Sequence, residues 1–366
     1  MKRLLILEDG TVFEGTTFGA EITVAGEIVM TSSMTGYQEI ITDPSYHGQI
    51  IAFTNPSIGN TGVNRDDYES IAPICKGIVV QEVSEYFNGR RESLTLDQYL
   101  KHQGIPGIKN VDMRMLRRKL REKGTMKASI VNPDDEFQHS YDQLRATVLP
   151  GNQVASVSTM KAYPSPGTGM IVVVIDMGVK HSILRELSKR KCNVIVLPYN
   201  VEAKQVLALQ PDGILLSNGP GNPNLLNGTI EMVREVEKKV PLFGIGLGHQ
   251  IFCLANGAKV RKMLDGHHGS NYPVEEVATG RVWSTAQNHN YVVEKTSLAG
   301  SDLILTYSEL NDRSVEGVQH KKVPGFSVQF EPEAAPGPQE SLEIFDAFIE
   351  LMDAEKEKRN VLRENA

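Results

Sequence analysis

In the second half of the chain, short apolar runs alternate with segments that repeat apolar residues at helical spacing. The apolar runs predict four buried strands, at residues 170–175, 193–197, 213–217 and 242–245. The segments after the first three runs predict helices, at residues 181–190, 201–209 and 229–239. Strands that are apolar on both faces and alternate with helices are typical of a parallel sheet covered by helices. This half is therefore predicted to be α/β with a mainly parallel sheet.

The first half has a different pattern and predicts an α+β domain. Residues 4–15 are interpreted as a hairpin, because an apolar run, an Asp-Gly turn and an alternating run follow one another. Two further strands and two helices are expected, at residues 26–31, 49–54, 94–102 and 113–123. The last of these helices is basic on one face, which we interpret as a solvated face, with a docking surface as the alternative.

These patterns divide the chain into four parts. The prediction is an N-terminal domain at residues 1–135, a linker at 136–168, an α/β domain at 169–355 and a charged tail at 356–366. A chain of 366 residues is long enough for two cores.

Charge and apolar content narrow the class of protein. The formal net charge is −7, which argues against a nucleic-acid or anionic-membrane partner, because both require basic surfaces. No run reaches the roughly 20 apolar residues of a membrane span, and the first residues lack the apolar core of a signal peptide. The expected location is cytoplasmic. The three cysteines are far apart and are expected to be reduced core residues.

The stretch at residues 241–257 is the most informative part of the chain. An apolar run is followed by a glycine-rich turn and then by an apolar helix that ends near Gly257. Such a strand-turn-helix lifts the turn residue to the top of a sheet, where enzymes of several families place a nucleophile. Here the turn residue is Gly246, which has no side chain that could attack a substrate. The sequence therefore predicts a nucleophile elbow that lacks its nucleophile.

Two more loops are expected beside this elbow, at residues 176–178 and 217–223. Each follows a predicted strand of the parallel sheet. Sites in such sheets lie at the carboxyl ends of the strands. The three loops are therefore predicted to meet there.

Three motifs in the second half carry a family resemblance. Residues 218–222 (Asn-Gly-Pro-Gly-Asn), 244–250 (Gly-Ile-Gly-Leu-Gly-His-Gln) and 327–333 (Ser-Val-Gln-Phe-Glu-Pro-Glu) resemble, in order, the three signatures of class I glutamine amidotransferases. The first half resembles the extra domain of one branch, the carbamoyl-phosphate synthase small subunits. The segments that carry this second resemblance include residues 7–10, 33–39, 43–46, 58–60 and 120–124.

The resemblance implies a reaction and a partner. In that family a cysteine at the elbow attacks the amide carbon of glutamine, a histidine accepts the thiol proton, and a glutamate orients the histidine. The ammonia released passes to a large ATP-grasp subunit, which uses ATP and magnesium to make carbamoyl phosphate from bicarbonate. No cofactor or metal is expected in the small subunit itself.

This chain departs from the family at two of the three catalytic positions. Gly246 stands at the position of the cysteine and Glu331 at that of the histidine, whereas Glu333 matches the orienting glutamate. Losing the nucleophile alone costs a hydrolase about six orders of magnitude in turnover. The expectation is a small subunit without glutaminase activity, which supports at most ammonia-dependent synthesis.

Positions that hold glutamine in the family are better preserved. By resemblance they are Ser45, Gly219, Gly221, Leu247, Gln250, Asn288, Asn290 and Tyr291. Asn290 replaces a usual glycine and Tyr291 another aromatic residue. Glutamine binding remains an open hypothesis.

Other interpretations compete with this one. The chain could be a freestanding glutamine-binding or interaction protein without enzymatic activity. The spacing of Gly244, Gly246 and His249, with Asp265 further on, mimics a dinucleotide-binding fingerprint that lacks its third glycine. Replacement of the nucleophile by Cys253 is a further alternative, but a core position is expected for this residue.

Overall fold

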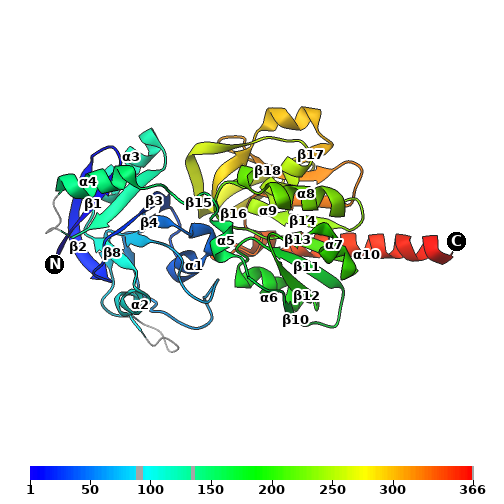
Figure 1. Ribbon diagram of the computed structural model, residues 1–366, viewed down its shortest axis with the longest axis horizontal. Helices are drawn as coiled ribbons and strands as arrows, with labels where there is room; N and C mark the ends of the chain where they lie inside the picture. Colours follow the sequence, from blue (N-terminus) through cyan, green and yellow to red (C-terminus); the bar gives the residue numbers. More distant parts are fainter. Residues whose placement is uncertain (88–93, 133–136, 365–366) are drawn as a thin grey trace. The chain divides into compact units, whose positions relative to one another are not determined.

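The computed structural model describes residues 1–87, 94–132 and 137–364 and separates into two compact units (Figure 1). The N-terminal unit comprises residues 1–150 and 263–270, and the C-terminal unit comprises residues 151–262 and 271–366. Residues 133–136, where the predicted first domain meets the predicted linker, lie outside the described part of the chain, as do residues 365–366 of the predicted tail.

A closed barrel forms the core of the N-terminal unit. Its strand order is β1-β2-β8-β6-β4-β3-β9. The strands are β1 (Lys2–Leu7), β2 (Val12–Gly19), β3 (Val24–Thr31), β4 (Gln49–Phe53), β6 (Gly77–Val79), β8 (Pro106–Lys109) and β9 (Met126–Val131). The predicted hairpin is confirmed, because β1 pairs with β2 in antiparallel register. The closure was not predicted, since it pairs β1 with β9 more than 100 residues away, for example Leu4 with Val131.

Short helices and one small sheet complete this unit. They are α1 (Tyr37–Thr42), η1 (Pro44–Tyr46), α2 (Leu96–Gln103), α3 (Met113–Lys123) and α4 (Phe137–Ala146), with β5 (Ser57–Ile58) paired to β7 (Glu82–Val83). The two helices predicted in this half are confirmed as α2 and α3. Met113, Leu116 and Leu120 of α3 are buried and pack into the barrel core.

A ten-stranded sheet forms the C-terminal unit, in the order β10-β12-β11-β13-β14-β19-β18-β17-β15-β16. Its parallel centre consists of β12 (Asn193–Pro198), β11 (Ile171–Asp176), β13 (Gly213–Leu216), β14 (Leu242–Ile245) and β19 (Gly325–Val328). The four predicted strands are confirmed as parallel neighbours. Antiparallel strands extend both edges: β10 (Tyr163–Ser165), β15 (Val260–Glu276), β16 (Val282–Val293), β17 (Leu303–Glu309) and β18 (Val315–His320).

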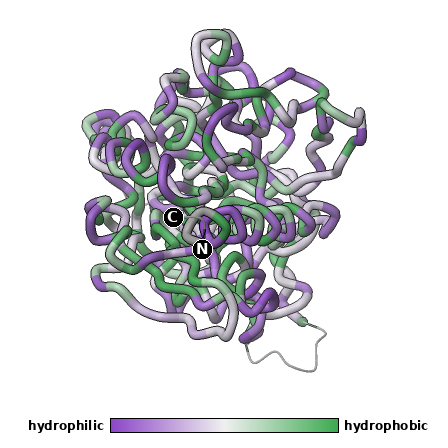
Figure 2. Tube along the Cα trace, turned by 90° about the vertical axis from the view of Figure 1, so that its right-hand side faces the viewer, coloured by the Kyte–Doolittle hydropathy of each residue, from purple (hydrophilic) through white to green (hydrophobic). Residues whose placement is uncertain are grey.

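Helices cover both faces of the parallel centre. One face packs against α7 (Ala203–Ala208), α8 (Asn227–Val236) and α9 (Leu247–Ala255). The other packs against α6 (His181–Lys189) and α10 (Glu343–Glu364). Hydrophobic and hydrophilic residues interleave along the trace, as one-sided burial requires (Figure 2). No helix in the described ranges is long and apolar enough to span a membrane.

The predicted linker and tail are more ordered than their sequence suggests. The linker contains α4, α5 (Val154–Val157) and β10, which adds an edge strand to the sheet. The tail continues α10 as far as Glu364. Residues 356–361 of the tail are mostly exposed, so this end of α10 depends on helical hydrogen bonds and local ion pairs such as Lys358–Glu355 rather than on core packing.

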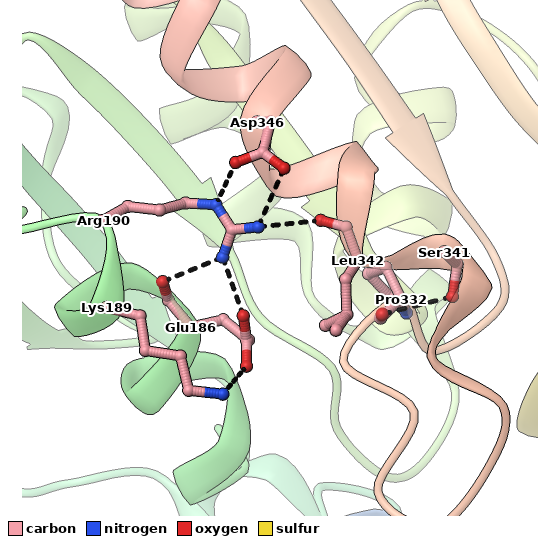
Figure 3. Close-up of polar contacts among 7 residues, drawn as sticks. All are labelled: Glu186, Lys189, Arg190, Pro332, Ser341, Leu342 and Asp346. Carbon is pink, nitrogen blue, oxygen red and sulfur yellow. Dashed lines mark hydrogen bonds and ion pairs between the residues drawn. The ribbon is translucent and has the colours of Figure 1, made fainter.

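Arg190 connects the end of α6 to the beginning of α10 (Figure 3). Its guanidinium binds both carboxylate oxygens of Asp346, at 2.6 and 3.1 Å, and donates to Glu186 Oε2 at 2.7 Å. It also donates to the carbonyl of Leu342 at 3.0 Å. The neighbouring Ser341 hydroxyl donates to the carbonyl of Pro332 at 3.1 Å. Arg190 therefore anchors the segment that positions residues 331–333.

We expect Arg190→Met to destabilise the protein by about 2 kcal/mol, because several charge-assisted hydrogen bonds are lost and the Leu342 carbonyl loses a donor. Lys189→Met is the matched control. It removes one exposed cation of the same cluster and should change the free energy of unfolding by less than about 0.5 kcal/mol. Chemical denaturation of both variants tests this. Equal losses would show that Arg190 acts only as a surface charge.

The stabilisation by Arg190 should also depend on pH. The hydrogen bond from Arg190 lowers the pKa of Asp346 below its ordinary 3.8. Burial acts to raise the pKa of Glu186, but hydrogen bonds from Lys189 and Arg190 outweigh it, so this pKa lies below 4.5. Lowered carboxylate pKa values stabilise the folded state above the unfolded-state pKa, and this contribution disappears as pH falls through the folded-state values.

The difference in stability between the parent protein and Arg190→Met should therefore be constant from pH 7 to about pH 5 and shrink towards about pH 3. Denaturation at each pH measures it. A difference that grows on acidification would contradict this account of the Arg190 contacts.

Candidate functional site

The elbow at Gly246 is the centre of the candidate site. It joins the end of β14 to the start of α9 with φ 55° and ψ −108°, a left-handed backbone that favours glycine. Its N–H donates to the carbonyl of Val328 at 2.9 Å, which fixes the turn against the end of β19. A Cβ atom built on Gly246 would meet Asn218 at 3.6 Å, an ordinary contact. The elbow thus has a positive-φ backbone and room for a side chain, which glycine does not supply.

Close backbone packing holds α9 directly against β13. The Gly248 N–H donates to the carbonyl of Ser217 at 3.0 Å. A Cβ on Gly248 would lie 2.2 Å from the carbonyl oxygen of Leu216, so only glycine allows this approach. The first N–H groups of α9 are consequently held at the carboxyl edge of the sheet, where a helix N-terminus favours negative charge.

The other two predicted loops meet at the same edge. The Asp176 carboxylate accepts hydrogen bonds from the N–H groups of Gly178 and Val179, both at 2.9 Å. The Ser217 hydroxyl accepts from the N–H of Met177 at 2.9 Å, which ties the loop after β11 to the loop after β13. The prediction that three loops converge at the ends of the parallel strands is confirmed.

A buried lysine that the sequence analysis did not single out lies among these loops. Lys180 is fully buried at the start of α6. Its Nζ lies 2.9 Å from Glu331 Oε2 and 2.9 Å from Glu333 Oε1, and it donates to the carbonyl of Ala335 at 2.7 Å. The signal that could have revealed it is the pair of glutamates two residues apart after a buried strand, because buried carboxylates need a cation nearby.

The residues expected to bind glutamine are only partly brought together. Gln250, in the first turn of α9, donates to the carbonyl of Tyr291 and to Gln329 Oε1, each at 2.9 Å. Leu247 begins α9, and its side chain lies near Gly219, where a Cβ would be 3.0 Å from Leu247 Cδ2. These contacts place the elbow helix beside the Gly-Pro-Gly loop and β16.

The remaining candidates lie as follows. Gly221 has a positive φ of 94° in the loop after β13. Asn288 and Asn290 are half-buried on β16. Ser45 belongs to the N-terminal unit, where its N–H donates to Asp43 Oδ1 at 2.8 Å. Gln329, which the sequence suggests is a scaffold residue, has its side chain buried against Gln250.

His249 and Cys253 are core residues. Burial lowers the pKa of His249 to about 3, and its Nδ1 lies 2.8 Å from the Ser327 hydroxyl. Burial raises the pKa of the Cys253 thiol far above its ordinary value, so the thiol stays protonated at neutral pH. The inward-facing His249 also removes support from the dinucleotide interpretation, whose third glycine it would have to replace.

Comparison with known proteins finds two family models that match successive parts of the chain. Residues 5–130 match the model of the carbamoyl-phosphate synthase small chain, CPSase domain, and residues 173–351 match that of class I glutamine amidotransferases. Among solved structures, the chain is similar to that of a putative GMP synthase subunit from Thermoplasma acidophilum, with 23% identity, a TM-score of 0.47, and coverage of 53% of this chain and 99% of that one.

The curated relatives are much closer in sequence. The carbamoyl phosphate synthase small chain of Streptococcus pyogenes serotype M3 is 57% identical over 353 residues, which cover 96% of this chain and 98% of the relative. That of Lactococcus lactis subsp. cremoris is 57% identical over 352 residues, with the same coverage of both chains. With both family models matched in order, the chain belongs to the carbamoyl-phosphate synthase small chain family and carries a class I glutamine amidotransferase domain.

Proposed function

We propose that this chain is a carbamoyl-phosphate synthase small subunit without glutaminase activity. Together with its partner, a large ATP-grasp subunit, it supports synthesis of carbamoyl phosphate from ammonium, bicarbonate and ATP. ATP and magnesium belong to the large subunit.

The single observation that carries the proposal is the elbow at Gly246. Its backbone has the positive φ of a nucleophile elbow, at 55°, yet no side chain projects from it. Covalent hydrolysis of an amide needs a group that attacks the carbonyl carbon. Cys253, seven residues further along α9, is buried and protonated. No thiolate is therefore available at the elbow.

Glu331 gives independent support. Its family counterpart is the histidine that accepts the thiol proton. Here the Glu331 carboxylate is an ion-pair partner of Lys180 at 2.9 Å. A carboxylate held by a buried ammonium group is a poor general base, because proton uptake would break the ion pair. Glu333 also pairs with Lys180 and has no histidine at position 331 to orient.

The positions expected to bind glutamine support retained binding of the amino acid less strongly than the elbow supports the loss of hydrolysis. Gln250 and the Gly-Pro-Gly loop are in place, but the Gln250 amide donates both to Tyr291 and to Gln329. The proposed function does not require glutamine to bind. Titration calorimetry with millimolar glutamine decides whether the scaffold still binds the amino acid.

The decisive assay supplies the chain and its large subunit with bicarbonate and ATP, and with either ammonium chloride or glutamine. We expect carbamoyl phosphate from ammonium and none above background from glutamine, because no group attacks the amide. Comparable rates with both nitrogen sources would disprove the loss of glutaminase activity. Failure to associate with the large subunit would instead favour a freestanding protein.

Restoring the missing groups should restore glutamine hydrolysis if the scaffold is intact. We expect Gly246→Cys/Glu331→His to release ammonia from glutamine on the order of 100-fold faster than the parent protein or either single variant. Gly246→Ser/Glu331→His is the matched control, since it has similar size but a much weaker nucleophile. No gain in the cysteine variant would show that the scaffold has changed beyond these two residues.

Any side chain at the elbow should cost stability. Gly246→Ala places a Cβ in ordinary contact but forces an L-residue into a left-handed backbone. We expect a loss of about 1–2 kcal/mol in the free energy of unfolding. Gly257→Ala is the control that measures only the cost of placing an L-residue at positive φ. Gly257 also has a positive φ (82°), and a Cβ there would meet no atom within 4 Å. Urea denaturation compares the two, and unchanged stability in Gly246→Ala would mean that the elbow is not strained.

A further inference from the structure

Four arginines form one exposed stripe on α3 in the N-terminal unit. Arg114, Arg117, Arg118 and Arg121 are all exposed, and their spacing of i, i+3, i+4 and i+7 places them on the same side of the helix. We call this stripe the arginine face. The opposite side of α3 is buried in the barrel core.

The arginine face has no partner within the described chain. None of its four guanidinium groups forms an ion pair or hydrogen bond with a residue that the structure describes. Lys119 differs, because its ammonium group reaches Asp9 Oδ2 at 3.0 Å. The lysine outside the arginine face thus has an ion-pair partner in the described chain, whereas the arginines are exposed to solvent.

Helix physics disfavours this arrangement. Cations at i, i+3 and i+4 repel one another. Arg114 also lies in the first turn, where the helix dipole favours negative charge. Asp112 caps this end through the N–H of Met115 at 2.9 Å, and Glu122 is the one acidic residue among the eleven of α3. A face of alternating acidic and basic residues would keep the helix soluble without repulsion between like charges. Because the arginines destabilise α3 itself, we expect their role to lie in contacts with another molecule.

The composition of the face indicates protein recognition. Arginine and methionine are enriched at protein interfaces, whereas lysine and glutamate, the usual solvating pair, are depleted there. Met115 lies beside the arginines and is 38% exposed. Leu264, which is 62% exposed, borders the other end of α3, where its carbonyl accepts from the N–H of Thr125 at 3.2 Å.

We infer that the arginine face is a docking surface for a compact acidic patch on the large ATP-grasp subunit. This inference rests on the proposed function, which supplies the large chain as the partner. Guanidinium groups bind carboxylates through two parallel hydrogen bonds, so four of them can select a small cluster of Asp and Glu residues.

The net charge favours an acidic protein over an extended polyanion. The whole chain carries −7, so nucleic acid or an anionic membrane would also meet its acidic surface. Electrostatic interactions decay over roughly 8 Å at physiological salt. An acidic patch of the size of one helix face is attracted by the arginines without meeting that repulsion.

The test compares the affinity of the full chain for the large subunit from the same genome. In Arg117→Glu/Arg121→Glu we expect the dissociation constant to rise about 10-fold or more near 0.1 M salt, and the dependence of affinity on salt to weaken. Lys238→Glu/Lys239→Glu is the matched control, because it changes net charge equally at two exposed positions of the C-terminal unit, and it should bind like the parent. Circular dichroism and melting verify that each variant is folded.

The outcomes separate the two proposals. If the parent chain binds the large subunit while the arginine variant binds equally well, the docking surface is wrong and the proposed partner stands. If the parent does not bind, both proposals fail. Binding of phosphatidylserine vesicles or of a DNA duplex by the parent at 0.1 M salt, abolished in the arginine variant, would overturn the assignment to a protein partner.

Discussion

The contact on which the candidate site depends is the one between the buried ammonium group of Lys180 and two carboxylates. Lys180 lies between β11 and α6, whereas Glu331 and Glu333 follow β19. Strands β13 and β14 lie between β11 and β19 in the sheet, so the contact spans the carboxyl ends of both. Arg190, directly after α6, binds the start of α10, and Ser341 in turn holds Pro332 between the two glutamates. One helix therefore fixes the 331–333 segment from both of its ends. Removing one partner from a buried ion pair generally costs about 3–5 kcal/mol, which gives Glu331 a structural reason to remain.

The same contact explains how the residues at positions 246 and 331 fit the fold. A glutamate at position 331 has a cation within 2.9 Å, and a glycine at position 246 relaxes the strained backbone that a cysteine would have to adopt. Both residues are therefore compatible with local stability. The elbow backbone is held by the Val328 carbonyl rather than by any side chain at position 246, so it keeps its shape when that side chain is absent.

The positively charged side chains of the protein lie in two kinds of environment. Lys180 is fully buried and Arg190 is partly buried, and both bind carboxylates from distant parts of the chain, which makes them elements of the fold. The arginines of α3 lie on an exposed face and bind no residue within the described chain. This contrast distinguishes charges that stabilise the folded chain from charges that remain available to another molecule. Net charge alone does not show the difference, because it averages over both sets.

Local pattern in the sequence determined the parallel strands, most helices and the three loops of the site, because burial on both faces and helical period leave direct marks on neighbouring residues. It also determined that the turn residue is glycine and that Glu331 and Glu333 lie two residues apart. Only the tertiary structure decided what balances these carboxylates, since Lys180 precedes Glu331 by 151 residues and nothing in the local pattern pairs the two segments. The tertiary structure also decided the closure of the barrel through β1 and β9 and the antiparallel extension of the sheet. Long-range strand pairing and buried ion pairs depend on which segments meet in space, and that information is spread over the whole chain.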